Sequence, residues 1–274
     1  MSAPEVIFQR DAPLLAKAVA ARLVTRLVDA VAARDTASLV LTGGGIGTAV
    51  LAELAAIPAR DAVDWRHVDI WWGDERFLPS GDKERNETGA RAALLDHVDV
   101  DPARVHPMPP SDGPDGDDPE AAAARYATEL RAAARPEDNR PEDNEPEDHR
   151  PEDHGAVPSF DVLLLGIGPE GHIASLFPGL PALHDDRSVV AVHGAPKPPP
   201  TRLTMTLTSI NAAREVWILA AGQEKANAVA LALSDAGPVQ VPAAGGRGRQ
   251  RTLFLLDAEA AGQLPQGMGR PTAH

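Results

Sequence analysis

The chain has 274 residues, a formal net charge of −14 at pH 7, and 43% hydrophobic but only 4% aromatic residues. This length suffices for one large α/β domain with a mainly aliphatic core, and the acidic balance argues against general binding to nucleic-acid phosphates. The absence of cysteine excludes disulfides, a thiol nucleophile and cysteine-ligated metals.

Helix and strand patterns alternate through the first hundred residues. An amphipathic segment rich in Ala, Leu and Val predicts a helix over 14–31. An apolar strand at 38–41 runs into a cluster of glycines, and a helix is expected over 48–56. The pattern then predicts a strand at 68–72 and a helix at 87–97.

Residues 136–155 are four tandem copies of an acidic unit, PEDNR, PEDNE, PEDHR and PEDHG. Proline at every fifth residue is incompatible with a regular helix, and neighbouring acidic units repel one another. We therefore expect 135–155 to be a disordered acidic insertion within a single domain that spans 1–274. Its nine acidic residues and three arginines carry a net charge of −6, so the remainder is only moderately acidic.

Strand patterns resume after the insertion. The near-continuous apolar run at 160–165 is typical of a parallel strand that is covered on both faces. Further strands are predicted at 189–192, 216–219 and 253–256, with a helix over 224–233. The alternation predicts a doubly wound, mostly parallel α/β sheet with helices on both faces. Such sheets bind ligands at the carboxyl ends of their strands.

The first candidate site is TGGGIGT at 42–48, which follows a predicted strand and opens a helix. Gly43, Gly44 and Gly45 allow the backbone to approach a ligand closely, and a helix start directs free N–H groups at an anion. The loop lacks the lysine of a Walker motif and the third glycine of a dinucleotide fingerprint. A sugar-phosphate cradle is favoured, with a plain tight turn as the alternative.

Three charged residues, Asp74, Glu75 and Arg76, follow the strand predicted at 68–72. Charges in such a place are costly unless they are paired or functional. Arg76 can hold a phosphate or lactone oxygen through its planar guanidinium, with Asp74 accepting from sugar hydroxyls or orienting Arg76. A structural ion pair is the alternative.

The segment LGIGPEGHIASLF at 165–177 presents a single histidine after a buried strand and a glycine-rich loop. A short helix is predicted to begin near His172, and a helix N-terminus favours the neutral imidazole. Neutral imidazole accepts a proton from water near pH 7, so His172 is the candidate general base rather than a structural histidine. Glu170 either opposes the helix effect or orients the ring.

Lys197 and Arg202 flank three consecutive prolines in APKPPPTR. Such a run predicts a stiff polyproline segment that fixes Lys197 at low entropic cost. Lysine occurs only four times in the chain, which favours an anion-binding role over the alternative of a solvated lysine on a rigid linker.

The motifs of two other hydrolase classes are missing. The chain has no Gly-x-Ser-x-Gly elbow for a serine nucleophile and no His-Glu-x-x-His zinc motif. Of the hydrolytic mechanisms considered, general-base catalysis without a metal is the one left. This chemistry suits an activated ester such as a lactone.

Four segments together resemble the 6-phosphogluconolactonase family. They are LTGGGIGTAVL (41–51), WWGDERFLP (71–79) with Asn86 following, FDVLLLGIGPEGHIASLFPG (160–179) and APKPPPTRLTMTLTSINAAREVWIL (195–219). The resemblance implies a sugar-phosphate isomerase-like fold, the substrate 6-phosphoglucono-1,5-lactone, and no cofactor. It further implies that His172 activates water and that the substrate is held by Gly44, Gly45, Arg76, Lys197 and Arg202. One departure is Ile46-Gly47, where many relatives are expected to carry Thr or Ser followed by Pro.

Two alternatives to the lactonase are a glucosamine-6-phosphate deaminase-like isomerase and a non-catalytic sugar-phosphate sensor. By resemblance, the isomerases follow their histidine with Phe-Asn, where this chain has SLFP at 175–178, and a sensor would carry a DNA-binding module that is not visible. The expected partner is a phosphorylated sugar lactone, without nucleic acid or membrane. No secretory pattern opens the chain and no apolar stretch approaches ~20 residues, so a cytoplasmic location is expected.

Overall fold

The computed structural model describes residues 3–134, 157–234, 236–265, 268 and 270–271. The acidic insertion predicted at 135–155 lies outside these residues. Within them, a seven-stranded sheet has the order β10-β1-β9-β8-β5-β2-β3, and every neighbouring pair is parallel. The predicted α/β class with a mostly parallel sheet is therefore confirmed.

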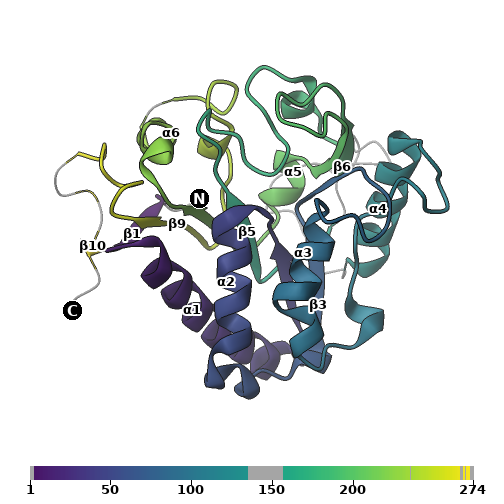
Figure 1. The fold of residues 1–274 in the computed structure, drawn as a ribbon, viewed down its shortest axis with the longest axis horizontal. Helices are drawn as coiled ribbons and strands as arrows, with labels where there is room; N and C mark the ends of the chain where they lie inside the picture. The colour runs from purple at the N-terminus through teal and green to yellow at the C-terminus, as the bar shows by residue number, and fades with distance from the viewer. Residues whose placement is uncertain (1–2, 135–156, 235, 266–267, 269, 272–274) are drawn as a thin grey trace, which may run out of the picture.

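The strands of this sheet are β1 (Glu5–Gln9), β2 (Ala37–Leu41), β3 (Val68–Trp72), β5 (Val162–Gly166), β8 (Glu215–Ala220), β9 (Arg251–Asp257) and β10 (Arg270–Pro271). The inner strands are rich in Leu, Val and Ile, and β5 and β8 are almost wholly buried, as expected for parallel strands covered on both faces. Figure 1 shows α1 (Ala12–Arg34), α2 (Gly44–Ala56) and α3 (Asn86–Ala93) side by side in front of the strands.

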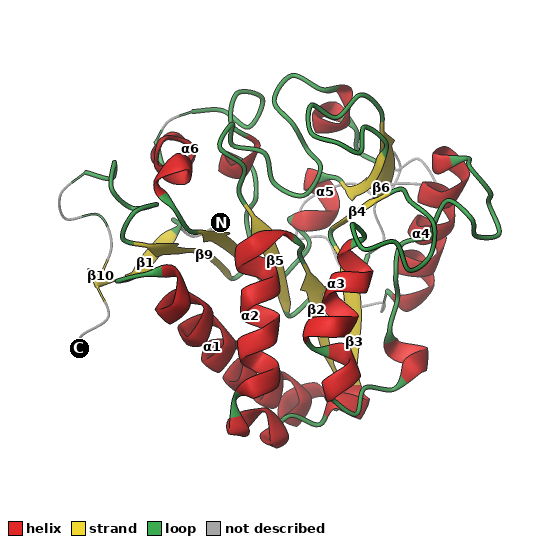
Figure 2. Ribbon diagram, in the orientation of Figure 1, coloured by secondary structure: helices red, strands yellow, loops and turns green. Residues whose placement is uncertain are grey.

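A second, antiparallel sheet has the order β4-β7-β6 and lies beside the first (Figure 2). Its strands are β4 (Asp74–Arg76), β7 (Arg202–Met205) and β6 (Val189–Val192). The strand predicted at 189–192 exists, but its expected place in the parallel sheet was wrong. An apolar run predicts that a strand is buried, but it does not predict which strand it pairs with.

The other helices are α4 (Pro119–Ala133), which packs against β6, α5 (Leu207–Ile210) and α6 (Ala226–Ala232). Short 3₁₀ turns occupy Pro58–Ala62, Trp65–His67, Leu95–His97, Pro102–Arg104, Pro181–His184, Gln223–Lys225 and Pro242–Ala244. Across the described ranges, no helix is both long and apolar enough to cross a membrane.

The sheet order reverses direction between β2 and β5. The chain passes from β2 outward to β3 on one side, whereas β5 is followed by β8 and β9 on the other. In an open parallel sheet, the loops that leave the strands at such a reversal diverge and leave a crevice at their carboxyl ends. The loops after β2, β3, β5 and β8 carry the candidate site.

Candidate active site

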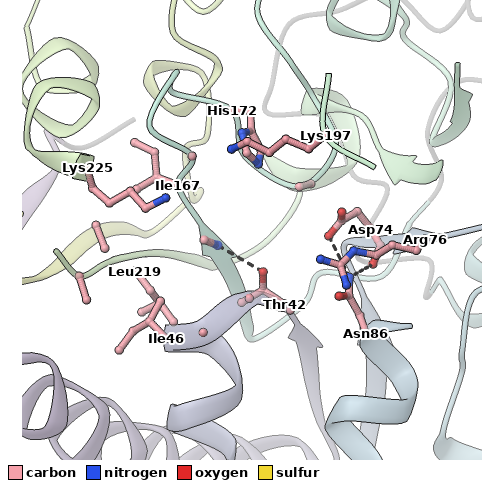
Figure 3. Close-up of a pocket in the computed structure, with 18 of the residues that line it drawn as sticks. Thr42, Ile46, Asp74, Arg76, Asn86, Ile167, His172, Lys197, Leu219 and Lys225 are labelled. Carbon is pink, nitrogen blue, oxygen red and sulfur yellow. Dashed lines mark hydrogen bonds between the residues drawn. The ribbon is translucent and has the colours of Figure 1, made fainter. Parts of the chain in front are cut away.

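A cavity of about 430 Å³ opens at the carboxyl ends of the parallel strands (Figure 3). Every site residue that the sequence predicts lines it: His172, Gly43, Gly44, Gly45, Asp74, Arg76, Lys197 and Arg202. The other polar side chains in its lining are those of Thr42, Asn86, Glu224 and Lys225. The topology has thus brought together segments that span most of the chain.

His172 is held by a hydrogen bond to Glu170, with 2.9 Å between Nδ1 and Oε1. Because a carboxylate only accepts, the ring proton resides on Nδ1, and Nε2 keeps the lone pair of the neutral imidazole. The ring also packs against Phe177, with 4.4 Å between the centroids. His172 is therefore oriented as a base.

The helix predicted at His172 is wrong. The residues around it form turns, and Ile173 makes isolated β-bridges to Ile167 and Leu176. Burial, instead of a helix N-terminus, lowers the pKa of His172, since its side chain is only 16% exposed. The Glu170 carboxylate opposes this shift and Lys197 reinforces it, so Glu170 both orients the ring and partly counters its neutral form.

Glu170 bridges His172 and Lys197, because its second oxygen, Oε2, accepts from the Lys197 Nζ at 3.0 Å. Burial opposes ionisation of Glu170. Hydrogen bonds and the charges of Lys197 and His172 outweigh that effect and lower its pKa. His172 and Lys197 are thus tied to one ionised carboxylate.

The proline-rich segment forms a closed loop, so the expected extended polyproline segment was wrong. The Ala195 N–H donates to the Pro200 carbonyl at 3.0 Å, which brings the ends of the segment together. Arg202 fixes the same loop from inside, because its guanidinium donates to the carbonyls of Lys197, Pro198 and Pro199 at 2.9–3.2 Å. Lys197 is therefore held by a braced loop.

Asp74 is buried and bonds to Asn86 and Ser175 instead of Arg76. The Ser175 hydroxyl donates to Asp74 Oδ2 at 2.7 Å, and the Asn86 amide donates to the Asp74 carbonyl at 2.9 Å. Arg76 donates to the Glu84 carbonyl, while its buried Nε has no hydrogen-bond partner among the described residues. An unpartnered N–H beside the cavity favours Arg76 as a ligand donor.

Glu75 fulfils the structural alternative that the sequence left open for this motif. Its carboxylate accepts from the backbone N–H groups of Arg76, Asn86 and Glu87 and lies 3.8 Å from the Arg85 guanidinium. Burial raises the pKa of Glu75 to about 7, against the opposing effects of Arg85 and these N–H donors. Glu75 thereby fixes the start of α3, which carries Asn86.

The glycine segment forms the first turn of α2, which begins at Gly44, earlier than the predicted residue 48. Gly44 has a φ of +81°, a conformation that favours glycine. A Cβ at Gly43 would lie 1.9 Å from Asn86 Oδ1, so only glycine permits this approach of β2 to α3. The free N–H groups of the helix start face a cavity that can take an anion.

Lys225 and Asn86 were not among the site residues predicted from the sequence. Figure 3 shows Lys225 across the cavity from Asp74 and Arg76. Burial and the neighbouring Lys197 lower its pKa. Its signal was present in the sequence, because it is another of the four lysines and follows the strand predicted at 216–219.

Comparison with known proteins assigns the family. The model of the family described as glucosamine-6-phosphate isomerases/6-phosphogluconolactonase matches residues 10–255. The chain belongs to this family. It is 58% identical to the 6-phosphogluconolactonase of Streptomyces coelicolor over 98% of both chains, and 50% identical to that of Mycobacterium tuberculosis over 93% of this chain and 96% of that one. The solved structure of 6-phosphogluconolactonase from Trypanosoma brucei superposes with a TM-score of 0.77 at 28% identity, covering 96% of this chain and 99% of that one.

Proposed function

We propose that this protein hydrolyses 6-phospho-D-glucono-1,5-lactone to 6-phospho-D-gluconate in the oxidative pentose phosphate pathway. The observation that carries the proposal is His172, a half-buried imidazole that Glu170 holds through Nδ1, in a cavity lined by cationic groups. Its occurrence in a chain 58% identical to a 6-phosphogluconolactonase over nearly the full length supports the lactone as substrate.

The phosphate of the substrate binds to the free N–H groups at the start of α2 together with Lys197 and Lys225. A helix N-terminus and ammonium groups are both suited to an anion, and all of them line the same cavity. Asp74 accepts from a sugar hydroxyl. The two ends of the substrate are thus recognised by groups of opposite charge, which fixes its direction in the cavity.

Hydrolysis begins when His172 Nε2 removes a proton from a water molecule that attacks the lactone carbonyl. The negative charge that develops on the carbonyl oxygen is stabilised by cationic donors of the cavity lining, among them the Arg76 guanidinium. The carbon–oxygen bond of the ring then breaks, and the imidazolium returns its proton to the departing ring oxygen. Glu170 stabilises the imidazolium that forms between these two proton transfers.

The test is an assay with freshly prepared 6-phosphogluconolactone that follows acid release above the spontaneous rate. We expect acceleration by the protein, and a loss of roughly 10²- to 10⁴-fold in kcat for His172→Ala with an unchanged melting temperature. No acceleration by the unsubstituted protein would refute the lactonase. An equally active His172→Ala variant would refute only the base.

The isomerase alternative is tested in parallel with glucosamine 6-phosphate as substrate and ammonia release as readout. We expect no turnover. The roles given to Gly43, Gly44, Gly45, Asp74, Arg76, Lys197 and Arg202 stay predictions, as do a single domain over 1–274 and a cytoplasmic location.

A further inference from the structure

We infer that Ser175 is a positioning residue that fixes the Asp74 carboxylate for recognition of a sugar hydroxyl. The inference deepens the proposed function and rests on it for the identity of the sugar. Ser175 does not line the cavity, so it acts through Asp74 and not on the substrate itself.

Ser175 is fully buried behind Asp74 and is held from two sides. Its backbone N–H donates to the Thr204 hydroxyl on β7 at 3.2 Å, and its own Oγ lies 2.7 Å from Asp74 Oδ2. The Arg202 guanidinium donates to the same Oγ at 3.5 Å. The remaining bonds of Arg202 go to the carbonyls of the proline-rich loop, so Arg202 is itself fixed.

The chemistry of these groups fixes the direction of the hydrogen bonds. A carboxylate can only accept, so the single hydrogen of the Ser175 hydroxyl points at Asp74 Oδ2, and the Ser175 oxygen is left to accept from Arg202 at 3.5 Å. Asp74 Oδ2 is thereby occupied. Among the residues that the structure describes, the other oxygen, Oδ1, has only a 3.5 Å contact to the Asn86 amide, so it keeps the capacity to accept from a ligand.

The arrangement gives Asp74 a defined orientation at low entropic cost. A carboxylate held by one short hydrogen bond from a buried donor has one free oxygen in a fixed place. Without the serine hydroxyl, Asp74 can rotate toward Arg202. It then presents its charge less well to the sugar, while the phosphate contacts are untouched.

The test compares the inhibition constants of two inhibitors of the lactonase reaction in Ser175→Ala. For 6-phosphogluconate, which carries both sugar hydroxyls and phosphate, we expect the inhibition constant to rise roughly 10- to 100-fold, with a similar rise in KM. For inorganic phosphate, which carries no sugar hydroxyl, we expect a change below about twofold.

Ser209→Ala is the matched control. Ser209 is likewise fully buried and its hydroxyl donates to the Ser188 carbonyl at 2.7 Å, outside the cavity. The Ser209→Ala variant should lower the melting temperature about as much as Ser175→Ala does, and it should leave both inhibition constants unchanged. If Ser175→Ala does not fold, Ser175→Cys, which keeps a weak donor of similar size, is measured in the same way.

A double variant separates positioning from a merely structural role. In an Asp74→Asn background, Ser175→Ala should add little further loss, because the group it positions is already altered. Additive losses, or kinetics equal to those of Ser209→Ala, would overturn the inference. Absence of lactonase activity in the unsubstituted protein would instead refute the proposed function, and binding of 6-phosphogluconate measured by calorimetry would still decide the role of Ser175.

Discussion

The Glu170 carboxylate is expected both to help and to hinder His172 as a general base. It orients the ring and, in the proposed mechanism, stabilises the imidazolium that forms, yet it also favours protonation of His172 before the reaction. Burial outweighs this second effect and keeps the pKa of His172 below its usual 6.5. We therefore expect kcat/KM to be constant through neutral pH and to fall only in acid, as His172 gains a proton.

Glu170→Gln should move this acid limb to lower pH. The neutral amide still accepts from Nδ1 but no longer raises the pKa of His172, and kcat should fall by up to about tenfold, or ~1.4 kcal/mol, as the imidazolium loses its counter-charge. The measurement is a pH profile of kcat/KM for both proteins. A limb that stays in place would show that it reports the substrate phosphate instead of His172.

Lys225→Met should weaken phosphate binding. Removal of one charge-assisted contact is expected to raise KM and the inhibition constant of inorganic phosphate roughly 10- to 100-fold. Lys17→Met, at an exposed position on α1, removes the same charge outside the cavity lining and serves as control. Equal constants for the two variants would exclude Lys225 from the phosphate site.

At the scale of residues, the sequence predicted those members of the candidate site whose neighbours in the chain mark them out. His172 stood out because glycines and a buried strand precede it, but the physical reason for its neutral form was wrong, since burial is a tertiary property. Ser175 could not be found, because its partners Asp74 and Arg202 are distant in the sequence. Lys225 could have been predicted, because lysine is rare in this chain, but only Lys197 was proposed on that ground.

At the scale of elements, two glycines at the start of α2 are expected to have different roles. Gly43 is needed for packing, and Gly45 is needed for binding of the anion. Gly43→Ala should destabilise the protein by about 1–3 kcal/mol, because its Cβ would collide with Asn86. Gly45→Ala meets no atom within 4 Å and should keep the melting temperature. Its methyl group would occupy the anion cradle and should raise the phosphate inhibition constant at least about fivefold.

Thermal unfolding and phosphate inhibition of both variants test this difference. Unchanged inhibition in Gly45→Ala would show that the anion does not bind at the start of α2. An unchanged melting temperature in Gly43→Ala would show that Asn86 moves aside without cost.

The elements of the parallel sheet followed from the sequence better than those of the small sheet. The strand predicted at 68–72 matches β3, although β3 lies at the edge of the sheet, because its mostly apolar residues form a local pattern and four of the five are buried. The pairing of β4 with β7 joins residues 74–76 to 202–204, and nothing local in either segment specifies that contact. α4 was missed although Asp118 and Pro119 supply a standard helix start.

For the whole molecule, the described residues on either side of the acidic insertion lead to a prediction. Ala133 and Pro158 line a pocket together with Ala37 at the amino end of β2, whereas the candidate active-site cavity lies at the carboxyl ends of the parallel strands. Replacing 136–155 with a Gly/Ser linker of equal length should leave kcat, KM and the melting temperature unchanged. A kinetic change beyond about threefold would imply that the insertion communicates with the active site.

The first strand of the central sheet pairs with the two strands that come last in the chain: residues 5–9 of β1 pair with 253–257 of β9, and residues 7–8 pair with 270–271 of β10. During synthesis, β1 leaves the ribosome long before its partner is made, and it cannot complete the sheet until almost the entire chain has emerged. Such distant pairing is slow to form. The enzyme is therefore expected to acquire its final structure only after translation has ended, and a nascent chain cut before β9 will have an unpaired N-terminal strand.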